Sequence, residues 1–212
     1  MPRVLTVSDE IVESLWTDRV AERYGDVDLV LAAGDLPFDY LDFLASALDR
    51  PLVFVPGNHD ADLSGYTRRR GLWLQSGFPA RYPGPAGAVN ADGRVVEAAG
   101  LRIAGLGGSI RYNDGPNQWT ERQQTRRATR LVRATHRQPV DVLLTHSPPR
   151  GAGDREDPPH RGFECLHMVV DRLKPAVLVH GHIHPHGQPV PDRVLGNTRV
   201  LNTVGYRILD LP

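Results

Sequence analysis

The chain has 212 residues, 40% of them hydrophobic, so it can bury one sizeable core, and we expect a single domain over residues 1–212. Its 25 basic and 25 acidic residues give a formal net charge of zero, which disfavours a general nucleic-acid or membrane-surface binder. The single cysteine, Cys165, excludes an internal disulfide, and no signal peptide or long apolar segment is visible, which predicts a soluble cytoplasmic protein.

The first third of the chain alternates apolar strands with helices. Strands are predicted at residues 3–7, 29–33 and 52–55, and helices at 11–24 and 38–48. This order indicates parallel strands with right-handed crossovers, in which ligands collect at the carboxyl ends of the strands. Each of these strands ends in polar residues: Asp9, Asp35, and the run Asn58, His59 and Asp60.

The middle of the chain is less regular. Residues 61–93 show little periodicity and are interpreted as a surface excursion that covers a site or as an ordinary loop. Residues 95–106 predict a hairpin, and a helix is predicted from an N-cap at Thr120 to Thr135. Its arginines form one stripe, Arg122, Arg126, Arg130, Arg133 and Arg137. We interpret this stripe as a solvated face, with a contact for an anionic partner as the alternative.

The last third repeats the pattern of a strand followed by polar residues. Strands at residues 140–144 and 176–179 precede His146 and the pair His182 and His184. A helix over 163–173 is expected to bury Cys165 as an inert core thiol. Short strands from residue 194, over 198–203 and over 206–211 are expected to close the chain as an antiparallel end. The other histidines of the second half, His136, His167, His180 and His186, are not assigned as ligands.

Five strand ends therefore offer carboxylates, an amide and imidazoles. Hard carboxylates mixed with imidazoles suit Mn, Fe or Zn better than Mg or Ca, and a carboxylate shared by two ions is the usual way to build a dinuclear centre. The order of these motifs, from Asp9 to His184, closely resembles the calcineurin-like metallophosphoesterase superfamily. Its pattern is Asp-x-His, Gly-Asp, Gly-Asn-His-Asp/Glu, a lone His and Gly-His-x-His.

The resemblance implies an α/β fold, a four-layer α/β/β/α sandwich, with two divalent metal ions. It assigns the ligands to two sites: Asp35 to both, Asn58, His146 and His182 to one, and Asp9 and His184 to the other. One position departs from the pattern, because Ile11 stands where Asp-x-His has its histidine. Loss of even an outer-shell partner costs about 10 to 100-fold in metal affinity, so we expect this first site to be weak or empty, filled by water, or completed by another residue.

Glu13 is the candidate for that completion, because it lies one helical turn beyond Asp9. Glu10 is expected to point elsewhere if the strand continues. Glu13→Ala would then lower metal content and activity.

The resemblance also implies hydrolysis of a phosphoester by a hydroxide that bridges two metals. His59 is expected to protonate the leaving group or to stabilise the transition state, with Asp60 holding its ring. The favoured substrate is a small phosphodiester, a cyclic nucleotide or a related compound, and the alternatives are a phosphomonoester or a phosphoprotein; nucleic acid is disfavoured by the neutral charge. Four loop residues are candidates for substrate contacts: Arg111, Tyr112, Asn117 and His160.

A non-catalytic role is the alternative of another class. The retromer subunit that resembles this superfamily keeps the fold but works as an interaction scaffold, and Ile11 raises the same hypothesis here. The seven other motif residues are all present, which favours an enzyme. The sequence does not predict the oligomeric state.

Overall fold

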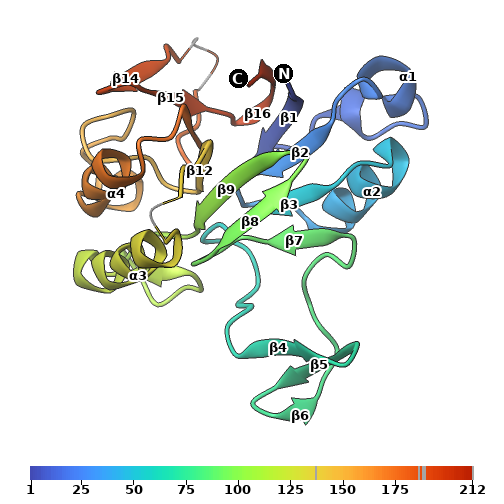
Figure 1. The fold of residues 1–212 in the computed structure, drawn as a ribbon, viewed down its shortest axis with the longest axis horizontal. Helices are drawn as coiled ribbons and strands as arrows, with labels where there is room; N and C mark the ends of the chain where they lie inside the picture. Colours follow the sequence, from blue (N-terminus) through green and yellow to red (C-terminus); the bar gives the residue numbers. More distant parts are fainter. Residues whose placement is uncertain (137, 186, 188–189, 212) are drawn as a thin grey trace.

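The structure is a computed structural model, and it describes residues 1–136, 138–185, 187 and 190–211. Arg137 of the predicted stripe and His186 lie outside the described residues. Two β-sheets pack face to face, and helices cover both outer faces (Figure 1). Within the described ranges, no helix is long and apolar enough to cross a lipid bilayer.

The first sheet has the strand order β16-β1-β2-β3-β7. Its members are β1 (Arg3–Ser8), β2 (Leu29–Ala32), β3 (Leu52–Phe54), β7 (Ala88–Asn90) and β16 (Gly205–Asp210). β1, β2, β3 and β7 run parallel, and β16 is antiparallel to β1. The predicted strand–helix order therefore produces a parallel sheet.

The second sheet has the order β14-β15-β13-β12-β9-β8. Its members are β8 (Val95–Ala98), β9 (Leu101–Leu106), β12 (Val142–Thr145), β13 (Val177–His180), β14 (Arg193–Leu195) and β15 (Thr198–Asn202). The four central strands are parallel, and the edge strands β8 and β14 are antiparallel to their neighbours. The predicted hairpin over residues 95–106 is confirmed.

Three hydrophobic clusters fill the spaces between four layers. The helical elements are η1 (Glu13–Leu15), α1 (Val20–Tyr24), α2 (Phe38–Leu48), α3 (Glu121–Ala134), η2 (Pro158–His160) and α4 (Cys165–Leu173). On β2, Leu29 and Leu31 face the core between the sheets, whereas Val30 and Ala32 face α1 and α2. A third cluster joins the second sheet to α3 and α4. Strands buried on both faces read as continuous apolar runs, and the predicted four-layer sandwich is confirmed.

Two predicted elements are wrong. The helix over residues 11–24 is instead η1 and α1, because a turn in which Val20 N donates to Thr17 O separates the buried Leu15 from the buried Val20 and Tyr24. The chain end is not wholly antiparallel, because β15 pairs in parallel with β13 and β16 crosses to the first sheet. Short-range sequence patterns do not specify such long-range pairing.

Residues 61–93 contain more structure than the predicted loop. β4 (Tyr66–Arg69), β5 (Leu72–Gln75) and β6 (Phe78–Pro79) form an antiparallel sheet of their own. This sheet and its connections, residues 61–87, project from the body of the molecule and are called the arm below (Figure 1). A last small pair, β10 (Ser109–Ile110) and β11 (Gln118–Trp119), precedes α3.

Candidate metal centre

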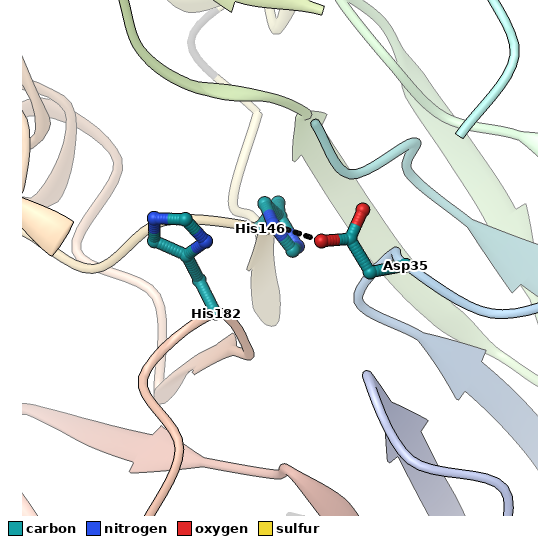
Figure 2. Close-up of side chains that lie close together, drawn as sticks. All are labelled: Asp35, His146 and His182. Atoms are coloured by element: carbon teal, nitrogen blue, oxygen red, sulfur yellow. Dashed lines mark ion pairs between the residues drawn. The ribbon is translucent and has the colours of Figure 1, made fainter. Parts of the chain in front are cut away.

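Five parallel strands each end in one of the predicted site residues. Asp9, Asp35 and Asn58 follow β1, β2 and β3, and His146 and His182 follow β12 and β13 of the other sheet. The carboxyl ends of these strands meet, which is where ligands bind in such sheets. Figure 2 shows the side chains of Asp35, His146 and His182 lying close together, each from a different strand end.

Sharp backbone turns mark three of these positions. Asp9, Asp35 and His182 have φ angles of 61°, 57° and 67°, in the left-handed region that side-chain-bearing residues rarely adopt. Such a conformation costs about 1–3 kcal/mol for a non-glycine residue and clusters at functional sites. The chain therefore turns sharply at each of these residues, shortly after the end of β1, β2 or β13.

His146 is completely buried and its tautomer is determined by the first sheet. Its Nδ1 lies 2.7 Å from the carbonyl oxygen of Ala33, which can only accept a hydrogen bond. Nδ1 therefore carries the proton in the neutral imidazole, and Nε2 keeps its lone pair. A hydrogen bond of this kind is the usual means of orienting a metal-binding histidine.

Acceptor atoms converge on His146 Nε2. The Oδ1 of Asn58 lies 3.0 Å away and the Oδ2 of Asp35 lies 3.3 Å away. Burial disfavours the imidazolium, but the adjacent Asp35 carboxylate outweighs this cost and raises the pKa of His146 to about 9. Burial also opposes the charge of Asp35, yet His146 lowers the pKa of that carboxyl to about 2. The three lone pairs therefore require a positive charge between them, either a proton or a metal ion.

His182 completes this set. Its Nε2 lies 2.7 Å from the carbonyl oxygen of Pro159, which leaves Nδ1 as the metal-binding atom. Burial lowers the pKa of His182 to about 3, so the ring is neutral at pH 7, as a ligand must be. One ligand atom from each of Asp35, His146 and His182 lies within 4.8 Å of the others. A carboxylate, an amide oxygen and two imidazoles are a set of ligands that fits a divalent metal ion.

The residues expected at the first site also lie together. Both carboxylate oxygens of Asp9 accept from the backbone N–H of His182, at 3.1 and 2.9 Å. The Nε2 of His184 lies 3.8 Å from Asp9 Oδ1, while its Nδ1 lies 3.0 Å from Oε1 of Glu10. Glu10 and His184 thus form a carboxylate–histidine pair, and the ring of His184 faces Asp9.

Ile11 occupies the position of the histidine in the family's Asp-x-His motif. Its apolar side chain is 44% exposed. Glu10 is expected to point elsewhere only if the strand continues, and this condition is not met, because β1 ends at Ser8 and Asp9 turns the chain. Glu13 is an exposed residue of η1, and no described hydrogen bond or ion pair connects its side chain to the site. The acidic residue beside the first site is therefore Glu10.

The loop after β3 is held in shape by Asp60. Its Oδ2 accepts from the backbone N–H groups of Gly57, at 2.7 Å, and Asp35, at 3.0 Å. The expectation that Asp60 holds the His59 ring is corrected, since this carboxylate is buried under the loop. His59 instead donates its backbone N–H to Asp35 Oδ1 at 2.8 Å, and its side chain is exposed beside a surface hollow that Asp35 and Phe38 also line.

Two glycines make room for the carboxylates. A Cβ atom on Gly57 would overlap Oδ1 of Asp35, and one on Gly181 would overlap Oδ2 of Asp9. The glycines of Gly-Asn-His-Asp and Gly-His-x-His are therefore required by close approach of backbone to side chain.

The predicted substrate residues divide into two groups. The hydroxyl of Tyr112 accepts from Asn58 Nδ2 at 3.2 Å, and the ring of His160 lies 5.4 Å from that of His182, so both border the centre. Asn117 donates to the carbonyl oxygens of Gly57 and Asp60 at 2.9 and 3.0 Å, so it supports the loop in place of the predicted substrate contact. Arg111 is exposed, and no described contact joins its side chain to the centre.

Sequence reasoning missed three contributors. The carbonyl groups of Ala33 and Pro159 select the histidine tautomers, and no side chain signals such a role. Arg155 donates to the carbonyl oxygen of His184 at 2.5 Å and brings a guanidinium beside the first site. The position of Arg155 in a polar loop ahead of His160 is the sequence feature that could have indicated this role.

A family model described as calcineurin-like phosphoesterase matches residues 7–186. The chain belongs to this family. As a calcineurin-like phosphoesterase it is a metal-dependent phosphoesterase, and the matched range contains the whole cluster built above.

Two curated proteins and one solved structure illustrate the range of similarity. The UPF0046 protein T07D4.2 of Caenorhabditis elegans is 33% identical over 99 residues, which are 46% of this chain and only 24% of that protein. An uncharacterized protein of Haemophilus influenzae is 27% identical over 184 residues, 73% of this chain and 72% of that protein. TT1561 of Thermus thermophilus has a TM-score of 0.66 at 16% identity, covering 99% of this chain and 94% of that chain, which shows a shared fold.

Proposed function

We propose that this phosphoesterase hydrolyses a small phosphodiester, a cyclic nucleotide or a related compound, with two divalent ions of Mn, Fe or Zn. The observation that carries the proposal is the convergence of Asp35, Asn58, His146 and His182 on one point beside the exposed His59. Bound there, the ions supply Lewis-acid activation of water and neutralise the phosphate charge. All other steps depend on side chains.

Asp35 is the residue that unites the site. Its Oδ1 accepts from the loop backbone at His59, and its Oδ2 faces His146. The carboxylate therefore cannot rotate without breaking one of these contacts. It holds the loop that carries His59 at a constant position relative to the buried ligands, which is the preorganisation that catalysis needs.

His59 acts as the proton donor. Its backbone is fixed by Asp35 and its imidazole faces solvent, where the leaving oxygen of a bound ester departs. An imidazole donates a proton near neutral pH and so avoids release of an unstable alkoxide. Tyr112 and His160, which border the centre, contact the ester.

Glu10 compensates in part for Ile11. The carboxylate of Glu10 on Nδ1 of His184 orients the ring so that Nε2 is the atom nearer to Asp9. Glu10 is thus a positioning residue for the first site, and Glu13 has no part in it.

The substrate class is tested by hydrolysis of bis-p-nitrophenyl phosphate and p-nitrophenyl phosphate with added Mn²⁺, Fe²⁺ or Zn²⁺. We expect kcat/KM for the diester to exceed that for the monoester by at least about tenfold, a difference of about 1.4 kcal/mol between the two transition states. Preference for the monoester would refute the diester assignment and leave the phosphoesterase assignment in place.

The scaffold alternative rests on Ile11, which gives the first site an exposed apolar residue where a ligand is expected. It predicts that the purified protein has no bound metal and that it hydrolyses no phosphoester with any added metal ion. It also predicts that Ile11→His restores neither. The intact second site argues against it.

A further inference from the structure

The zero net charge conceals a strong asymmetry along the chain. Residues 1–65 contain 13 acidic and 4 basic residues, whereas residues 66–140 contain 4 acidic and 13 basic residues. The two segments therefore carry formal charges of −9 and +9. Opposite charges on different surfaces of one molecule favour association with a complementary molecule.

The three strands of the arm lie in the basic segment, and their sheet lacks a core on one side. Its sheet does not join either large sheet. One face is covered, since the Trp73 ring stacks on Tyr82 at 3.8 Å and Tyr66 meets Tyr82 edge-on at 5.7 Å. Three consecutive arginines lie here: Arg68 and Arg69 end β4, and Arg70 begins the turn to β5.

The other face of the arm is open and apolar. The strand register places Arg69 opposite Leu72, and Leu74 opposite Pro79, so these four side chains share one face. Leu72 is 63% exposed and Pro79 is also exposed, whereas Phe78 pairs with Gln75 and therefore lies on the opposite face, with Trp73. A sheet of three short strands gains stability mainly by packing such a face against another surface.

A complementary surface lies on the acidic segment. Trp16 is 42% exposed and packs against Tyr40 and Phe43 of α2, with ring centroids 5.1 and 6.4 Å apart. Three exposed acidic residues lie near this aromatic cluster. Glu13 and Asp18 are close to Trp16 along the chain, and Asp39 lies one helical turn before Phe43 in α2. None of the three forms a salt bridge with any residue that the structure describes. We call this surface the Trp16 patch.

We propose that the open face of the arm docks onto the Trp16 patch of a second copy of this chain, so that two copies form a two-fold dimer. The arm returns to the body beside α2, where Gly87 N donates to Asp42 Oδ1 at 2.9 Å. The basic arm and the acidic patch are thus joined through α2. A two-fold axis then pairs each arm with the partner's patch, and the interface closes.

The combination of charge and apolar area selects this partner. A nucleic acid would pair with the arginines but leave Leu72 and Leu74 in water. The Trp16 patch offers both an aromatic surface and carboxylates, so both features of the arm are satisfied at once.

Sedimentation velocity of the full chain tests the dimer. The wild-type protein sediments as a dimer, and raising salt from about 0.05 M to about 0.5 M weakens it by screening the charges. Charge reversal on the arm, Arg68→Glu with Arg69→Glu and Arg70→Glu, raises the dimer dissociation constant by at least about tenfold. The matched control makes the same charge change on α3, with Arg122→Glu, Arg126→Glu and Arg130→Glu, and keeps the dimer.

Complementation makes the test independent of any effect of the variants on folding. The patch variant Glu13→Arg with Asp18→Arg and Asp39→Arg is monomeric alone. Mixed with the arm variant it forms a heterodimer, because each reversed arm meets a reversed patch and each native arm a native patch. A monomeric wild type, an arm variant that still dimerises, or a mixture that stays monomeric would overturn the proposal. A monomeric wild type that binds phosphatidylserine vesicles would identify the arm as a lipid-binding surface instead.

Discussion

The Nδ1 of His146 lies 2.7 Å from the carbonyl oxygen of Ala33, so the first sheet determines the tautomer of a histidine that the second sheet supplies. This bond crosses the core between the two sheets. It leaves Nε2 free beside Asp35 and Asn58, and the metal site consequently depends on how the sheets pack.

Replacing His146 tests this site directly. His146→Ala removes a ligand from a buried cluster, and we expect metal affinity to fall by more than about 100-fold, since even outer-shell partners contribute about 10 to 100-fold. Metal content measured by mass spectrometry on the purified variant reports the loss. His136→Ala, at an exposed position after α3, is the control and keeps the wild-type content. Equal metal content in the two variants would contradict the assignment.

His59 is expected to act on the ester and not on the metal. His59→Ala should lower kcat by about 10²–10⁴-fold, the usual contribution of a general acid, with metal content unchanged. Steady-state hydrolysis of the diester and metal analysis of the same sample give both quantities. A variant that loses its metal would show that His59 is a ligand.

Gly57→Ala should damage the loop sterically. The new methyl group overlaps Oδ1 of Asp35, so the loop must move away from the carboxylate. We expect a loss of about 1–3 kcal/mol in the free energy of unfolding, as for other overpacked sites. Chemical denaturation measures it. In Gly87→Ala the added atom makes only ordinary contacts, so this control stays close to wild type, and equal stabilities would refute the argument.

The two candidate acidic residues are separated by a matched pair. Glu10→Ala should reduce affinity at one of two metal sites by about 10 to 100-fold, because His184 loses the carboxylate that orients it. Glu13→Ala should change neither metal content nor activity. Calorimetric titration with Mn²⁺ after removal of bound metal distinguishes the variants, and the opposite result would restore Glu13 as the compensating residue.

Much of the fold and the location of the site could be predicted because both depend on local patterns. Leu29 to Ala32 face apolar neighbours on both sides, so the strand appears as an unbroken apolar run. Asp9, Asp35 and His146 follow such runs, and parallel strands bring their ends together. The family resemblance then assigned them to metal sites.

The remaining features depend on contacts that sequence patterns do not carry. The direction of Glu10 follows from the left-handed turn at Asp9, and the role of Asn117 follows from two carbonyl groups that lie 57 and 60 residues away. Adjacency in the sequence suggests that Asp60 is a partner of the His59 ring, but its Oδ2 accepts hydrogen bonds from the backbone N–H groups of Gly57 and Asp35 instead. The arm was missed because its strands are short and mostly exposed, without the alternation of a half-buried sheet.

Metal-dependent hydrolysis of a phosphoester at this centre can be measured by titrating metal-stripped protein with Mn²⁺ while bis-p-nitrophenyl phosphate turnover is followed. We predict no turnover without metal and a turnover rate that rises with added Mn²⁺ and saturates when the site of Asp35, His146 and His182 is filled. Protein that binds the ion at this site but hydrolyses neither the diester nor p-nitrophenyl phosphate, with Mn²⁺, Fe²⁺ or Zn²⁺, would contradict this prediction.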